Sequence, residues 1–233
     1  MIQAALNGAR VPMGPERLAA EAAAVVALGC RSIHLHVHDA DGRESLAARD
    51  VAAAVAAVRA AAPGAEIGVS TGEWITADVA GAIAAWTDPL PDMASANLAE
   101  PACADVIGAL RARGVAIEAG IFSPADADAL ARAGEPVHRV LVESGDAPPE
   151  LGDDQLAVDA AIAARLDALG VAAPRLHHGD GAQTWAVIAR ARARGLAVRI
   201  GLEDVETLPD GEPADANAPL YAAALGLRRP PGS

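Results

Sequence analysis

The strongest constraint on the fold is an alternation of two residue patterns that repeats eight times along the chain. Short β-type apolar runs alternate with longer Ala-, Leu- and Arg-rich runs of helical spacing. We expect strands at 2–7, 32–38, 66–70, 92–97, 115–121, 138–143, 174–179 and 197–203. We expect helices at 15–28, 46–62, 77–86, 102–113, 124–133, 153–169, 183–194 and 215–226. Eight strand–helix units in 233 residues predict an α/β fold, a (β/α)8 TIM barrel, as a single domain over residues 1–233.

An open, doubly wound parallel sheet is the alternative arrangement of eight such units. Dinucleotide-binding sheets of that kind carry a G-x-G-x-x-G turn after the first strand, and this sequence has no such turn there. No linker, repeat or low-complexity tract divides the chain. The closed barrel is therefore the favoured fold.

The charged residues exclude several classes of function. The sequence contains no lysine, so a Schiff-base aldolase, a pyridoxal-phosphate enzyme and a Walker A nucleotide site are all excluded. The formal net charge of −13 argues against nucleic acid and against an anionic membrane surface as partners. Cys30 and Cys103 lack metal-ligand spacing, and no secretory signal is visible. We expect a cytoplasmic protein that forms a homo-oligomer.

Strand parity predicts a polar interior at one end of the barrel. In the second strand, Ile33, Leu35 and Val37 share one face and the histidines share the other. If the aliphatic faces meet the helices, the inward set is Asn7, His34, His36, Ser70, Ser95, Asn97, Glu118, Glu143, Arg199 and Glu203. Barrel interiors are normally filled by branched aliphatic residues, and active sites lie at the carboxyl ends of the strands. The convergence of polar residues there indicates a site.

Two of these histidines are suited to hold a metal ion. His34 and His36 lie on the same face of one strand, about 7 Å apart between Cα atoms, so their imidazoles can converge on one divalent cation. Glu203 is the best third ligand, because the eighth strand lies one strand away from the second in a closed barrel. Taken alone, an H-x-H pattern is also compatible with a strand that is merely rich in histidine. The inward parity favours the metal site.

Other polar residues near the strand ends are candidates for catalysis and binding. Asp204 could act as a general base, tuned by Arg199, although the "LED" segment is also typical of a helix entry. Ser70, Thr71 and Gly72 offer hydroxyl and N–H groups suited to an oxyanion, or form a plain turn. Gly179 and Gly181 occupy a loop position where many barrels bind phosphate. His177 and His178 could line the site, whereas Trp74 and Trp185 are expected to pack against helices.

Five motifs in order resemble the β-keto acid cleavage enzymes, a family that includes 3-keto-5-aminohexanoate cleavage enzyme. They are ALNGAR (5–10), HLHVHDADGRES (34–45), IGVSTGEW (67–74), RLHHGDGAQTW (175–185) and RIGLED (199–204), and they span nearly the whole chain. The resemblance implies a (β/α)8 barrel with catalytic Zn(II) held by His34, His36 and Glu203. It implies that a β-keto acid condenses with acetyl-CoA as co-substrate, giving acetoacetate and a new acyl-CoA.

The resemblance also implies roles for the remaining residues. Asp204, assisted by Arg199, would remove a proton from the α-carbon of the substrate, and Ser70 would act beside them. We expect the substrate to contact Asn7, Arg10, Thr71, Gly72, Ser95, Asn97 and Glu118, and the CoA thioester to lie near Gly179 and Gly181.

The chain departs from the family pattern in three places. Arg10 and Gly120 stand where the aminohexanoate enzyme carries acidic residues, which argues against a cationic substrate. The loop after the sixth strand lacks the glycine-rich run that CoA contacts would lead us to expect. Two alternatives stay open: a metal-dependent barrel hydrolase or lyase that does not use CoA, and a non-catalytic binding barrel.

Overall fold

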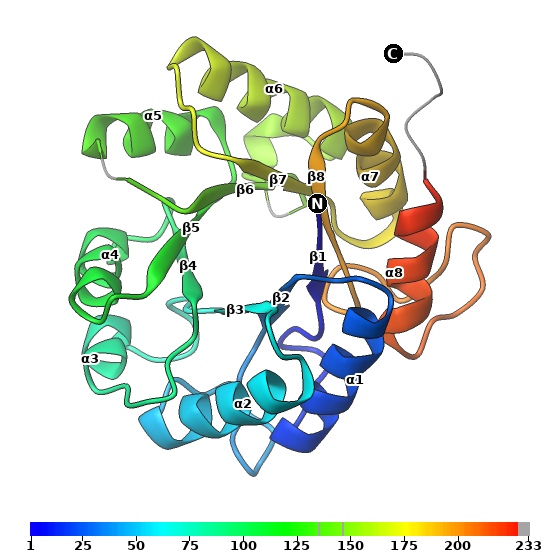
Figure 1. The fold of residues 1–233 in the computed structure, drawn as a ribbon. Helices are drawn as coiled ribbons and strands as arrows, with labels where there is room; N and C mark the ends of the chain where they lie inside the picture. Colours follow the sequence, from blue (N-terminus) through cyan, green and yellow to red (C-terminus); the bar gives the residue numbers. More distant parts are fainter. Residues whose placement is uncertain (135, 146, 228–233) are drawn as a thin grey trace.

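A computed structural model of the chain confirms the (β/α)8 barrel. It describes residues 1–134, 136–145 and 147–227, so the last six residues of the predicted domain lie outside the described residues. Eight parallel strands close into a ring in sequence order, β1 to β8, and β8 pairs with β1. The helices surround this ring (Figure 1). Closure of the ring excludes the open, doubly wound sheet.

Every predicted strand and helix is present within the described residues. The strands are β1 (Ile2–Ala5), β2 (Ser32–Leu35), β3 (Glu66–Val69), β4 (Met93–Asn97), β5 (Ala116–Ile121), β6 (Arg139–Glu143), β7 (Arg175–His178) and β8 (Ala197–Ile200). The helices are α1 (Pro15–Ala27), α2 (Ala48–Ala61), α3 (Val79–Ala84), α4 (Cys103–Ala112), α5 (Pro124–Ala133), α6 (Gln155–Ala168), α7 (Thr184–Ala193) and α8 (Asn217–Gly226). Short 3-10 helices, η1 (Pro149–Leu151) and η2 (Gly181–Gln183), lie in the loops after β6 and β7.

The strands β2 and β8 end three residues earlier than the sequence predicts. They stop at Leu35 and Ile200, whereas the apolar–polar alternation continues to residues 38 and 203. As a result, His36 and Glu203 lie just beyond the carboxyl ends of their strands, at the mouth of the barrel.

The core between strands and helices follows the predicted parity. Ile33 and Leu35 of β2 are fully buried in one apolar cluster together with Val51 and Val55 of α2. Neighbouring strands are in register, with Ile33 opposite Ile67 of β3. The aliphatic faces of the strands therefore pack against the helices, and the opposite faces point polar side chains into the barrel.

A buried polar cluster fills the amino-terminal half of the barrel interior. The Arg139 guanidinium pairs with Glu118 and donates to Ser32 Oγ at 2.9 Å. Gln3 Nε2 donates to the same Glu118 carboxylate at 3.3 Å. Arg139 and Glu118 are 2% and 0% exposed, so each needs the other to offset the cost of burying its charge. This cluster fills the barrel interior on the side of the strands' amino ends, opposite the mouth.

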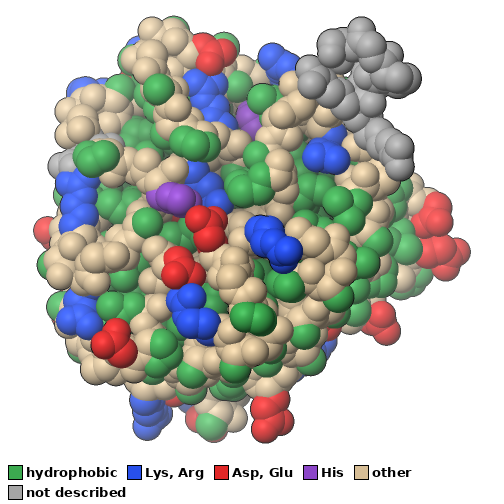
Figure 2. All heavy atoms as spheres, in the orientation of Figure 1, with side chains coloured by type: hydrophobic (Ala, Val, Ile, Leu, Met, Phe, Trp, Pro, Cys, Tyr) green, Lys and Arg blue, Asp and Glu red, His purple; other side chains and the backbone are tan. Residues whose placement is uncertain are grey.

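The surface carries arginine and acidic side chains interspersed among apolar ones, as Figure 2 shows for one face. Within the ranges that the structure describes, no helix has the length and apolar character needed to cross a membrane.

Candidate active site

The structure brings His34, His36 and Glu203 together at the barrel mouth. His36 Nε2 lies 3.2 Å from Glu203 Oε1, and His34 Nε2 lies 3.7 Å from Glu203 Oε2. One donor atom from each of the three residues lies within 4.8 Å of the other two. Two elements at opposite ends of the sequence, β2 and the turn after β8, thus supply one cluster of three donor groups.

The geometry of this cluster fits a four-coordinate metal ion. In a tetrahedral zinc site with bonds near 2.1 Å, neighbouring ligand atoms lie roughly 3.4 Å apart, between the two measured separations. Glu203 Oε2 is buried and has no hydrogen-bond partner among the described residues. An unpaired buried carboxylate oxygen is costly unless a cation satisfies it. The residues present therefore fit a metal ion.

The charges around the cluster also favour a cation. Burial lowers the pKa of His34 to about 4, which keeps its imidazole neutral, as a metal ligand must be. Burial would lower the pKa of His36 as well, but the Glu203 and Glu44 carboxylates outweigh it and raise that pKa to about 9. A bound metal ion would take the place of the proton that gives His36 its positive charge. Arg199 and the two histidines hold the pKa of Glu203 well below its usual range, against the effect of burial.

The turn that carries Glu203 is held by close backbone packing. A Cβ on Gly201 would lie 1.8 Å from the carbonyl oxygen of Ala5, and one on Gly8 would lie 2.9 Å from Glu203 Cγ. The amide N–H of Leu202 donates to Asn217 Oδ1 at 2.9 Å. Both glycines allow β1 and the turn after β8 to approach closely enough for Glu203 to reach the histidines.

We predict that Gly201→Ala destabilises the fold by about 3 kcal/mol, since the added methyl meets backbone that cannot move aside cheaply. Urea unfolding measures the effect. Gly108→Ala is the matched control: a Cβ at Gly108 in α4 meets no atom within 4 Å, so its stability should stay equal or rise slightly. Equal stabilities for the two variants would contradict this account of Gly201.

Asp204 and Arg199 lie beside the three donor groups. Arg199 Nη2 donates to Asp204 Oδ1 at 2.6 Å and to Glu203 Oε1 at 2.8 Å. Burial raises the pKa of Asp204 to about 6, although the Arg199 guanidinium opposes the rise. The second oxygen, Asp204 Oδ2, is buried and has no partner among the described residues. Asp204 thus has one oxygen fixed by Arg199 and one free to accept a proton.

The cluster forms part of the wall of a cavity of about 600 Å³. Polar lining residues include Arg10, Ser70, Ser95, Asn97, Glu100, Glu143, His178 and Asp180. The apolar wall includes Val11, Phe122, Leu141, Ala147, Pro148 and Pro149. The Arg10 side chain lies at the rim, 74% exposed and 3.4 Å from Asp180. The cavity can therefore take a small polar molecule with an apolar portion.

Three of the residues expected to contact substrate, Arg10, Ser95 and Asn97, line this cavity, and so does the catalytic candidate Ser70. The other expected contacts are absent from its lining. Asn7 instead exchanges two hydrogen bonds of 3.0 Å with the backbone of His36. The Thr71 hydroxyl donates to the carbonyl of Ser95, and its amide donates to Ser95 Oγ at 3.1 Å. These two side chains hold the residues that face the cavity.

Glu118 differs most from its expected place. Its side chain points into the barrel as parity predicts, but it is fully buried in the ion pair with Arg139 and does not line the cavity. One of its oxygens lies 3.8 Å from His34 Nδ1. This distance is too long for a hydrogen bond, and His34 Nδ1 has no hydrogen-bond partner among the described residues.

The two loop glycines after β7 also lie outside the cavity lining. The amide of Gly181 donates to the carbonyl oxygen of Asp204 at 2.8 Å. A Cβ on Gly179 would lie 2.4 Å from Gln155 Oε1. Gly181 therefore joins the β7 loop to the Asp204 turn, Gly179 packs it against helices α6 and α7, and Asp180 between them lines the cavity.

The two histidines at the end of β7 face different surroundings. His178 lines the cavity, pairs with Glu143 and lies 3.6 Å from Asp204 Oδ1. His177 faces outward to helix α6, where it bonds to Asp159 at 2.5 Å.

Sequence reasoning missed Glu44 and misplaced Trp74. Glu44 Oε1 lies 2.5 Å from His36 Nδ1, and its other oxygen accepts from Trp74 Nε1 at 2.7 Å. Trp74 was expected to pack against helices, yet it is 59% exposed and lines the cavity. Trp185 does pack against the apolar core. The only signal for Glu44 was its place in the motif at 34–45.

Comparison with known proteins identifies the family of the chain. A family model for beta-keto acid cleavage enzyme matches residues 1–230. No curated protein matches the sequence significantly.

Among solved structures, the complex of ObcA with oxaloacetate is similar, with a TM-score of 0.69 and 19% identity over 92% of this chain and 62% of that chain. The ternary complex of ObcA with C4-CoA adduct and oxalate gives 0.68 and 19% over 93% and 62%. A HpcH/HpaI aldolase/citrate lyase family protein from Burkholderia cenocepacia J2315 gives 0.54 and 16% over 86% and 87%.

At these identities the structural likeness shows the fold alone, and this chain spans about three fifths of the ObcA chains that it matches. The family model carries more weight, because it covers the barrel from β1 through α8, with every residue of the candidate site inside the match. The chain belongs to the beta-keto acid cleavage enzyme family.

Proposed function

We propose that the protein is a zinc-dependent enzyme that exchanges acyl groups between a β-keto acid and acetyl-CoA, giving acetoacetate and a new acyl-CoA. The observation that carries the proposal is the convergence of three metal-ligand side chains beside a buried Asp–Arg pair in one cavity. The match to the beta-keto acid cleavage enzyme family supports a β-keto acid as the substrate.

In this proposal His34, His36 and Glu203 hold the zinc ion. When bound there, zinc supplies a Lewis acid that polarises the β-keto carbonyl of the substrate. Asn7 fixes the backbone of His36, and Arg199 Nη2 holds Glu203 through a 2.8 Å hydrogen bond to Oε1.

Asp204 moves the proton. Its free oxygen accepts a proton from the α-carbon of the β-keto acid, while Arg199 holds the other oxygen in place. The resulting carbanion attacks the thioester carbonyl of acetyl-CoA and releases the CoA thiolate. The thiolate then adds to the original β-keto carbon and the adjoining carbon–carbon bond breaks, which releases the new acyl-CoA. Asp204 returns its proton to the remaining carbanion, which completes acetoacetate.

Hydroxyl and amide groups on the opposite wall orient the substrate carboxylate. Ser70, Ser95 and Asn97 reach the cavity from the ends of β3 and β4. Asn97 Nδ2 donates to Glu100 Oε1 at 2.8 Å, which fixes the amide plane. The Ser95 hydroxyl is likewise fixed by the amide of Thr71, so two of the three groups are preorganised, as a binding site for an oxyanion requires.

The cavity walls favour a neutral substrate tail. The charge of Arg10 is opposed by Asp180 at the rim, and the wall near η1 is made of apolar residues such as Leu141 and Pro148. No acid occupies position 120, where a Cβ on Gly120 would lie 2.5 Å from Asn97 Oδ1. The structure of ObcA in complex with a C4-CoA adduct supports a CoA thioester as the second substrate, because ObcA has a similar fold.

A panel of β-keto acids with neutral, anionic and cationic tails tests the proposal, with and without acetyl-CoA. We expect acetoacetate and acyl-CoA to form in equal amounts, only when acetyl-CoA is present, and fastest with neutral tails. Turnover that does not require CoA would instead favour a metal-dependent hydrolase or lyase.

A further inference from the structure

The carboxylate of Glu44 joins a metal-ligand candidate to the wall of the cavity. One oxygen lies 2.5 Å from His36 Nδ1 and the other accepts from the indole N–H of Trp74 at 2.7 Å. Glu44 itself is held in place by the loop after β2. Its backbone forms a bridge with His38, and the amide of Ser45 donates to the carbonyl of Val37 at 2.9 Å. Both oxygens are thus used, and they connect two different parts of the site.

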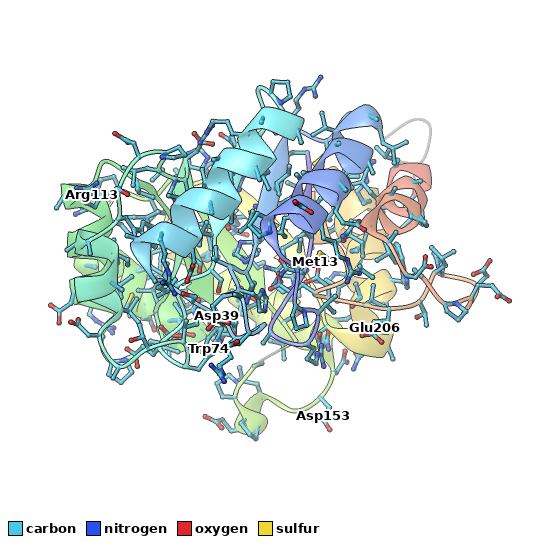
Figure 3. The ribbon with its side chains drawn as sticks, turned by 90° about the horizontal axis from the view of Figure 1, so that it is seen from below. Met13, Asp39, Trp74, Arg113, Asp153 and Glu206 are labelled. Atoms are coloured by element: carbon cyan, nitrogen blue, oxygen red, sulfur yellow. The ribbon has the colours of Figure 1, made fainter. Side chains whose placement is uncertain are left out.

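Trp74 occupies an exposed position that burial alone would not fix. Its side chain is 59% exposed, and it lies in the loop after β3 at the same end of the barrel as Asp39 (Figure 3). The indole stacks on the His36 ring at 6.5 Å between centroids, with 23° between the planes. It also lies directly over Gly72, where an added Cβ would come within 2.1 Å of two ring carbons. Three contacts therefore hold the indole: Glu44, His36 and the bare backbone of Gly72.

We propose that Glu44 is a positioning residue that orients His36 toward the metal and at the same time fixes Trp74 as a wall of the substrate cavity. This inference rests on the proposed zinc site. A metal-bound imidazole is normally oriented by an acceptor on its second nitrogen, and loss of that acceptor weakens metal binding by about 10- to 100-fold. The Glu44 carboxylate fills this position for His36 Nδ1 while Nε2 faces Glu203.

The second oxygen of Glu44 gives this residue a role beyond orienting His36, because it also holds Trp74. A carboxylate accepts hydrogen bonds on both oxygens, whereas an amide has one acceptor and one donor group. In a Glu44→Gln variant the side chain keeps its shape but can satisfy only one of the two N–H groups. The charge that strengthens both bonds is lost as well.

Three variants separate the two roles of Glu44, which are to orient His36 and to fix Trp74. The readouts are zinc affinity and quenching of tryptophan fluorescence. Zinc affinity is measured by competition with a chromogenic chelator, and exposure of Trp74 by acrylamide quenching. Subtracting the signal of Trp74→Phe isolates Trp74 from Trp86 and Trp185. We expect Glu44→Gln to weaken zinc binding about 10-fold or more and to increase quenching of Trp74. Gly72→Ala should displace the indole and increase quenching, with zinc affinity within about twofold of the wild type.

The matched control is Glu16→Gln, an exposed acid in the first turn of helix α1, which should change neither readout. If the wild type binds zinc and Glu44→Gln binds it equally well, the inference is wrong while the proposed function stands. Unchanged quenching in Glu44→Gln would also overturn it. If the wild type binds no zinc, the proposed function itself fails.

Discussion

Replacing Asp204 with asparagine is expected to lower kcat by about 10³-fold while the zinc content stays the same. The amide cannot accept the α-proton, and removal of a positioned general base typically costs about 10²- to 10⁴-fold. Zinc should remain because His34, His36 and Glu203 are untouched, and Arg199 keeps its 2.8 Å bond to Glu203. Steady-state kinetics and metal analysis of the same preparation measure both effects.

The control for this variant is Asp105→Asn, the same change at an exposed position on helix α4. It should leave kcat and zinc content unaltered. Thermal melting of both variants checks that the fold survives, because Asp204 is buried and its loss removes one partner of Arg199. Turnover near the wild-type rate in Asp204→Asn would exclude Asp204 as the base.

The fold could be predicted from the sequence because the signal for a barrel is local and repeated. Each strand–helix unit carries its own alternation of apolar residues, and a glycine in the left-handed region ends helix α5 at Gly134 as the sequence indicates. An error in one boundary does not affect the others. Strands β2 and β8 were placed correctly even though their predicted ends lie three residues too far along the chain.

The candidate site was predictable to the extent that strand parity determines it. Parity gives the face of a strand on which a side chain lies, so it placed His34 and Arg199 inside the barrel. It does not give the depth of a side chain along the barrel axis. Glu118 has inward parity, yet it belongs to the buried layer because Arg139 on the neighbouring strand reaches across to pair with it. That pairing depends on the register of the closed sheet.

Residues in loops were not predictable by parity, because a loop can fold back over the strand that precedes it. The loop after β2 returns Glu44 to His36, eight residues away. The loop after β3 lays Trp74 over Gly72 because glycine has no side chain to prevent it. The two loops then meet where Trp74 Nε1 donates to Glu44, and no periodicity in the sequence records contacts within or between loops.

The His36→Ala variant is expected to lose its zinc and, with it, activity. Structural zinc sites contribute about 10–16 kcal/mol in total, which over four ligands is roughly 3 kcal/mol each, so zinc affinity should fall by about 10²-fold or more. The remaining ligands, His34 and Glu203, lie 3.7 Å apart and cannot by themselves define a site of tetrahedral geometry.

His138→Ala provides the matched control for this loss. His138 is a partly exposed histidine that pairs with Glu66 at 3.4 Å, just before β6 and far from the barrel mouth. Its replacement should leave zinc content and activity unchanged, since it removes an imidazole of the same chemistry from a position outside the cluster of His34, His36 and Glu203. If His36→Ala retained as much zinc as His138→Ala, the three side chains at the barrel mouth would not be the metal site, and the zinc-dependent mechanism would have to be abandoned.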